Sequence, residues 1–94
     1  MRVRILRKMW DVSFVPRKDL PRTVDGMCSE PDKPGKSITV AASLTGERRL
    51  DVIIHEMLHA ADWHKDEEWV EEVGSDIARA LWRLGYRGPT DGTK

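Results

Sequence analysis

Short runs of alternating or β-branched apolar residues in the first half of the chain predict a small β-sheet. Residues 2–6 look extended, and residues 10–15 fit a strand with one buried face because apolar and polar side chains alternate. Residues 27–30 could form another strand, and the β-branched side chains within residues 37–43 predict one more. Prolines and a glycine around residues 33–36 indicate the turn of a hairpin. We therefore expect a small antiparallel sheet of about three strands.

In the second half of the chain, apolar residues recur with the 3.6-residue period of an α-helix. Thr45 or Ser43 can cap a first helix that runs to about residue 63. Asp66 can cap a second helix, and Gly85 can end it. The apolar stripe expected to be buried on the second helix comprises Trp69, Val73, Ile77, Ala80 and Leu84. Since few residues separate the helices, we expect an antiparallel helical hairpin packed on the sheet, which is an α+β fold.

Length and charge limit the classes of function. The 94 residues suffice for one small domain, which we place at residues 1–88, followed by a disordered tail at residues 89–94. The 16 Lys and Arg residues balance 16 Asp and Glu residues, so we expect no nucleic acid and no membrane as partner. Locally, residues 55–76 carry eight Asp and Glu residues, with Lys65 as the one Lys or Arg, and such a cluster would suit a cation.

Two features favour a cytoplasmic protein. Cys28 is the one cysteine of the sequence, so an internal disulfide cannot form, and we assign this residue no role. The basic start of the chain lacks the continuous apolar core of a signal peptide, and no run of apolar residues approaches the length that spans a membrane.

All three histidines of the sequence lie within residues 55–64, beside a glutamate. His55, Glu56 and His59 form the HExxH pattern. On a helix, positions four apart share a face, so both imidazoles can bind one metal ion while Glu56 reaches a water bound to it. The alternative is a helix surface with no metal, because five positions with three fixed residues also match by chance.

A catalytic zinc usually has three protein ligands and an open position for water. The candidates for the third ligand are His64, Glu67, Glu68, Glu71 and Glu72. In a helical hairpin, residue 72 should stand at the height of the histidine pair, and a buried stripe centred on Val73 turns Glu72 toward it. His64 remains a minor alternative, and Glu68 and Glu71 are expected on a solvated face. The zinc interpretation therefore depends on Glu72 lying beside His55 and His59.

Asp76 lies one turn beyond Glu72 on the same flank of the second helix. A histidine that binds zinc usually donates its other ring N–H to a carboxylate or a carbonyl, which fixes the tautomer of the ring. We therefore expect Asp76 to be the carboxylate that orients one of the histidines.

Together, HEMLH at residues 55–59 and EVGSD at residues 72–76 resemble the motifs of the gluzincin metallopeptidases, HExxH on one helix and E-x-x-S/A-D on the next. The resemblance covers residues 37–85 and looks closest to the smallest, single-domain members, with a zincin-like fold. It implies one Zn²⁺ bound by His55, His59 and Glu72, with Glu56 as general base and Asp76 as the partner of a histidine.

The resemblance also implies how a substrate binds. In the family, the strand before the first helix usually lies at the sheet edge and pairs with an extended peptide. This points to the strand of Ser37, Ile38, Thr39, Val40 and Ala41. The expected partner is thus a peptide or protein substrate in extended conformation, and the protein is expected to be a monomer or weakly self-associating.

Larger gluzincins have a second, helical subdomain that closes the cleft and supplies a Tyr or His to stabilise the oxyanion. Only 22 residues follow Glu72 in this sequence, so we do not expect that subdomain within them. Tyr86 is the one tyrosine, and packing is its expected role. Two hypotheses therefore stand: a zinc metallopeptidase that hydrolyses peptide bonds, and a non-catalytic binding module whose zinc only stabilises a small core and whose edge strand binds a partner.

Overall fold

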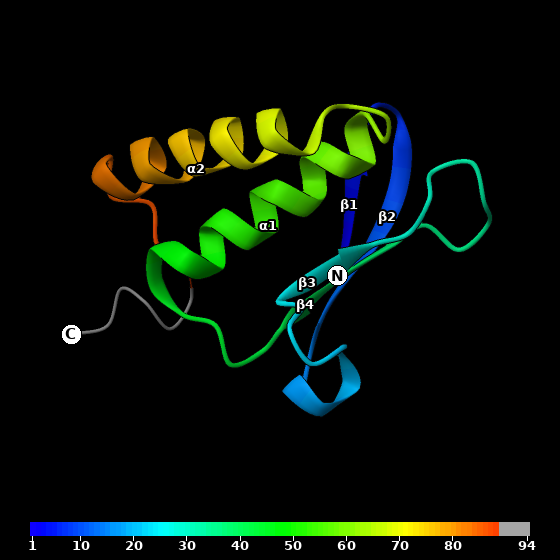
Figure 1. Cartoon of the computed structure of the whole chain (residues 1–94), viewed down its shortest axis with the longest axis horizontal. Coiled ribbons are helices and arrows are strands. Elements are labelled where there is room, and N and C mark those ends of the chain that lie inside the picture. Colours follow the sequence, from blue (N-terminus) through cyan, green and yellow to red (C-terminus); the bar gives the residue numbers. More distant parts are fainter. Residues whose placement is uncertain (89–94) are drawn as a thin grey trace.

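The computed structural model describes residues 1–88, and within them the chain forms a four-stranded sheet and two α-helices (Figure 1). The elements in chain order are β1 (Arg2–Ile5), β2 (Lys8–Val15), a short 3₁₀ helix (Arg17–Asp19), β3 (Gly26–Cys28), β4 (Ser37–Ala41), α1 (Gly46–Ala61) and α2 (Glu67–Arg83). The expected α+β class, a small sheet packed on a helical hairpin, is confirmed. The tail expected at residues 89–94 lies outside the described residues.

The sheet has the strand order β1-β2-β4-β3, and it is mixed rather than antiparallel. β1 pairs antiparallel with β2, β2 pairs parallel with β4, and β4 pairs antiparallel with β3. The expectation of about three antiparallel strands was therefore wrong in strand number and in one pairing. The reason is the connection after β2, which carries the chain outward to β3, so that the following hairpin returns β4 into the gap beside β2.

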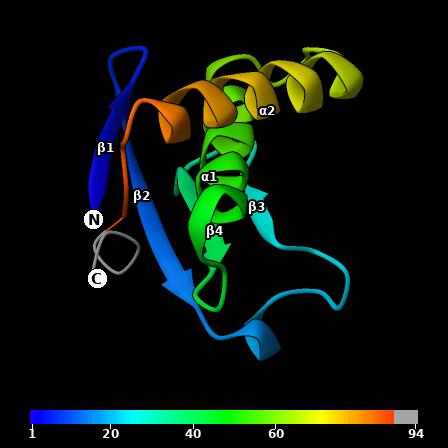
Figure 2. The same ribbon diagram turned by 90° about the vertical axis from the view of Figure 1, so that its left-hand side faces the viewer.

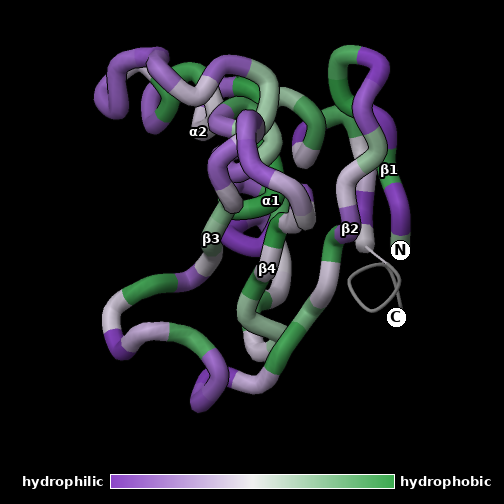
Figure 3. The backbone as a smooth tube through the Cα atoms, turned by 90° about the vertical axis from the view of Figure 1, so that its right-hand side faces the viewer, coloured by the Kyte–Doolittle hydropathy of each residue, from purple (hydrophilic) through white to green (hydrophobic). Residues whose placement is uncertain are grey.

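β4 consequently lies inside the sheet, and the expectation of an edge strand at Ser37–Ala41 was wrong. The composition of β4 fits this position, because Ile38, Val40 and Ala41 are all fully buried and suit a strand with neighbours on both sides. Figure 3 shows the hydropathy of the chain along this strand. The edge on this side of the sheet is instead β3, which has only three residues. Short edge strands are a common protection against uncontrolled pairing.

α1 lies between the sheet and α2 (Figure 2). The core below it is built from Trp10 and Val12 of β2, Ile38 and Val40 of β4, and Val52 of α1. These side chains remove a continuous apolar surface from water, which is the main force that holds a domain of this size together. The alternation predicted for β2 is thus confirmed at its two most buried positions.

α2 packs on α1 through small side chains. Val70, Gly74 and Ala78 are its buried residues. A Cβ atom added at Gly74 would lie 3.6 Å from Leu58 Cδ1 and 3.7 Å from the backbone of His55, so the helices approach closely at this glycine. The distance between packed helices depends on the side chains at the contact, and small ones permit the closest approach.

The stripe expected to be buried on α2 was therefore wrong. Trp69, Ile77 and Leu84 are 42%, 38% and 72% exposed. The true contact stripe is rotated by roughly 100° around the helix axis from a stripe centred on Val73. This rotation decides which acidic side chains of α2 face the histidines of α1.

The helix ends follow the predicted signals closely. Thr45 occupies the N-cap position of α1, although its side chain makes no capping hydrogen bond. The Asp66 carboxylate accepts a hydrogen bond from the backbone N–H of Trp69 at 3.3 Å and so caps α2, as expected. Gly85 follows α2 with a φ of +99°, a conformation that favours glycine. Neither helix of residues 1–88 combines the length and the apolar character needed to cross a membrane.

Candidate metal centre

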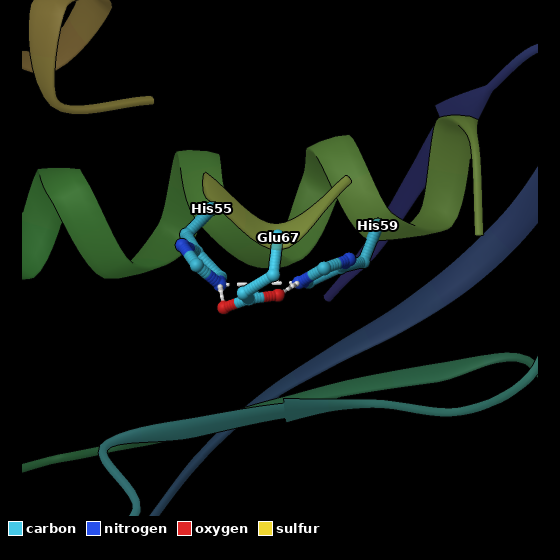
Figure 4. Close-up of side chains that lie close together, drawn as sticks. All are labelled: His55, His59 and Glu67. Atoms are coloured by element: carbon cyan, nitrogen blue, oxygen red, sulfur yellow. Dashed lines mark hydrogen bonds and ion pairs between the residues drawn. The ribbon is translucent and has the colours of Figure 1, made fainter. Parts of the chain in front are cut away.

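His55 and His59 lie one turn apart on α1 and point to the same place, where they meet Glu67 from the first turn of α2 (Figure 4). The two imidazole Nε2 atoms are 3.1 Å apart. Glu67 Oε2 lies 3.2 Å from Nε2 of His55, and Glu67 Oε1 lies 2.9 Å from Nε2 of His59. The two histidine rings therefore lie together on one face of α1, as HExxH predicted. The carboxylate of Glu67 is the third side chain of the cluster.

The chemistry and spacing of these three side chains suit a metal ion. Imidazole nitrogen and carboxylate oxygen bind Zn²⁺ at about 2.0–2.2 Å, and neighbouring ligand atoms around a tetrahedral ion then stand about 3.3 Å apart. The observed separations of 2.9–3.2 Å are close to that value. The described residues therefore contain a group, His55, His59 and Glu67, that could hold a metal ion.

Glu67 was among the candidates in the sequence, whereas Glu72, the favoured candidate, does not lie beside His55 and His59 as expected. The Glu72 side chain is exposed and lies outside this group. Because the contact stripe is Val70, Gly74 and Ala78, it is Glu67 that flanks the stripe on the side of the histidines. A zinc site formed with Glu72 does not fit this arrangement. The candidate third ligand is Glu67 instead.

Asp76 does not orient a histidine either. Its carboxylate is exposed and forms an ion pair with Arg79 at 3.0 Å. The residue of this segment that does reach α1 is Ser75, whose hydroxyl donates to the two carboxylate oxygens of Asp51 at 3.1 and 3.3 Å. The expectation for Asp76 failed for the same reason as that for Glu72, since both lie on the outward side of the rotated helix.

Glu56 is the buried acidic residue of α1, with 8% of its surface exposed. Burial raises the pKa of its carboxyl group, the neighbouring His55 opposes this rise, and the carboxylate of Glu67 adds to it. Glu56 lines the same pocket as His55, His59 and Glu67, and its position there is a shielded one.

β3 forms the opposite wall of a cleft above this group. One end of the cleft is lined by Met27, Cys28 and Trp63, next to His59. The other end, next to His55, carries charged side chains and includes Arg48, Asp51 and Glu71. Both ends share the residues that line the middle of the cleft, which are Val24, Gly26, His55, Glu56 and Glu67. The candidate metal ligands therefore open onto a groove that runs beside the edge strand.

The cysteine in this cleft is poorly suited to act as a nucleophile. Burial raises the pKa of the Cys28 thiol to about 12, and the nearby Glu56 carboxylate adds to the shift. Since the thiolate is the reactive form, a thiol with this pKa stays protonated near neutral pH. The raised pKa thus disfavours a cysteine and histidine hydrolase, although both residue types line the same cleft.

A network of charges fixes the segment that leads into β3. Asp25 accepts hydrogen bonds from Arg17 and Arg48, each at 2.7 Å, and Arg17 also donates to the Val24 carbonyl at 2.8 Å. Hydrogen bonds from Arg48 and Arg17 lower the pKa of Asp25, so its carboxylate stays charged at neutral pH. These contacts tie the start of β3 to α1, next to Glu56. No sequence motif indicated this network, because its members are distant along the chain.

Gly26 provides a test of how closely β3 packs against the candidate base. A Cβ atom at this position would lie 2.8 Å from Val52 Cγ1 and 3.2 Å from Glu56 Cγ. We expect Gly26→Ala to lower the free energy of unfolding by about 1–3 kcal/mol, because a buried side chain must move to admit the methyl group. Urea unfolding followed by tryptophan fluorescence measures this change. Met27→Ala on the exposed neighbouring side chain is the control and should change stability by less than about 0.5 kcal/mol.

Compared with protein-family models, with curated proteins and with solved structures, the chain matches none. The gluzincin resemblance therefore rests on the residues of this chain, and of its two motifs HEMLH keeps its expected geometry while EVGSD does not.

Proposed function

We propose that this chain is a zinc-dependent peptidase whose metal ligands are His55, His59 and Glu67 and whose general base is Glu56. The observation that supports the proposal best is the position of the buried Glu56 carboxylate beside three converging metal-ligand side chains. A structural zinc site has four protein ligands and needs no neighbouring base, whereas three ligands and a free position are typical of a hydrolytic site.

Zn²⁺ bound by these ligands would polarise the scissile carbonyl and lower the pKa of a coordinated water towards neutrality. Glu56 would accept a proton from the attacking water and pass it to the leaving amine, as a general base and then a general acid. His55 and His59 would fix the ligand geometry, because both project from one rigid helix. Glu67 would complete the set from the capped first turn of α2.

The substrate we propose is an extended peptide or protein segment that pairs with β3. This strand is the last of the sheet on this side, and its residues line the cleft opposite His55, Glu56 and His59. A peptide that added a strand here would lay its backbone across the metal ligands while its alternate side chains met the two ends of the cleft. The edge-strand idea is thus transferred from Ser37–Ala41 to Gly26–Cys28.

Hydrolysis with and without a chelator tests the proposal. Zinc-loaded protein is incubated with unfolded casein, and the products are followed by mass spectrometry. We expect cleavage that stops with chelator and returns when zinc is restored. Absence of cleavage in the zinc-loaded protein, with an extended substrate in excess, would argue against a peptidase.

A second candidate function is a binding module in which the metal only stabilises the fold. The observation in its favour is that the three candidate ligands join two helices of a small domain, so that a metal would hold α1 and α2 together. The same experiment distinguishes the candidates when melting temperature is measured in parallel. A large fall on chelation without any cleavage would favour the binding module.

A further inference from the structure

α2 carries a second apolar stripe that the rest of the fold leaves largely exposed. Its members are Trp69, Val73, Ile77, Ala80 and Leu84. They follow the spacing of one helix face, adjacent to the face that packs on α1. Val73 is half-buried and the other four side chains are exposed. A row of largely exposed apolar side chains that includes a tryptophan is typical of a protein interface.

The charges beside this stripe are divided between the two ends of the helix. The first part of α2 carries Glu68, Glu72 and Asp76, and the last part carries Arg79 and Arg83. An antiparallel copy of the same helix would place the acidic part of one protomer opposite the basic part of the other. An anionic membrane does not fit, because the acidic half would be repelled.

We propose that α2 is a dimerisation helix that pairs with α2 of a second copy of this chain in antiparallel orientation. With Ile77 opposite Ile77 of the second copy, Trp69 falls near Leu84 and Val73 near Ala80 across the two-fold axis. The same register brings Glu72 near Arg83. One arrangement therefore satisfies the apolar stripe and the charges together, as a self-complementary interface with two-fold symmetry requires.

The area of contact between the two α2 helices limits the expected affinity of the dimer. α2 has 17 residues, and a helix of that length is about 25 Å long and about 10 Å wide. A single pair of such helices lies at the small end of the range for stable interfaces. We therefore expect a dimer that dissociates on dilution. Because the stripe lies on a different face of α2 from Glu67, the proposal is independent of the peptidase activity.

Sedimentation of the full chain at several concentrations measures the association. We expect the wild type to shift from monomer to dimer as concentration rises, and Glu72→Arg or Arg83→Glu to weaken the dimer roughly tenfold, because each change replaces two attractions by two repulsions. The double variant Glu72→Arg with Arg83→Glu should restore dimerisation. Asp32→Arg in the exposed β3–β4 turn is the control and should leave association unchanged.

Cysteine cross-linking tests the orientation and does not depend on the charges. In a Cys28→Ser background, Ile77→Cys should form a disulfide-linked dimer with a mild oxidant, whereas Val73→Cys should not, because antiparallel pairing sets the two copies of residue 73 about 12 Å apart. A wild type that stays monomeric at all concentrations would overturn the proposal. Cross-linking through residue 73 instead of residue 77 would also overturn it, because it would indicate parallel pairing.

Discussion

Replacing Glu56 by glutamine should abolish peptide hydrolysis while leaving the bound zinc in place. The carboxylate is proposed to take the proton of the attacking water, and an amide of nearly the same shape cannot do so. The contribution of a positioned general base is typically about 10²–10⁴-fold in rate. His55, His59 and Glu67 are unchanged in this variant, so the metal content by elemental analysis should equal that of the wild type.

The fold should tolerate this change. Glu56 lies at a buried position where the charged form is disfavoured, so a neutral isostere does not add a desolvation cost. Glu72→Gln makes the same chemical change at an exposed site on α2 and is the matched control, which should retain full activity. Hydrolysis by the Glu56→Gln protein at the wild-type rate would remove Glu56 from the mechanism.

Glu67→Ala should weaken zinc binding by more than about 100-fold, because loss of a group that only orients a ligand already costs 10–100-fold. The carboxylate of Glu67 lies within 3.2 Å of both imidazoles, and the remaining two histidines cannot complete a three-ligand site. Competition with a chromogenic chelator measures the affinity, and elemental analysis gives the stoichiometry. One ion per chain is expected for the wild type.

Glu72→Ala is the decisive comparison, because the sequence alone favoured Glu72 as the ligand. Its side chain is exposed and outside the cluster, so we expect wild-type affinity and one bound ion. Loss of zinc from Glu72→Ala with retention in Glu67→Ala would reverse the assignment made from the structure. Equal loss or equal retention in both variants would remove Glu67 as a specific ligand.

Several elements of the fold could be predicted because their signals are local. Alternation identified β2, the prolines and Gly35 marked the β3–β4 turn, and Asp66 marked the start of α2. Within the site, the spacing of His55 and His59 was enough to place both rings on one face, because four residues is nearly one helical turn. Each of these features depends on residues within a few positions of each other.

The order of the strands in the sheet could not be predicted from such local signals. Whether Ser37–Ala41 lies at an edge or inside the sheet depends on where the chain goes after β2. That path is set by packing and by the contacts of Asp25 with Arg17 and Arg48, which are far apart in the sequence. The high apolar content of β4 was compatible with a central strand but did not require one.

The sequence by itself determined the α+β class, the position of the two helices, and the pairing of His55 with His59 beside Glu56. Only the tertiary structure decided the rotation of α2, because helix packing is governed by how closely two surfaces can approach, and Gly74 permits a contact that large apolar side chains do not. That rotation moved Glu67 into the site, and it left Trp69 and Ile77 on the surface.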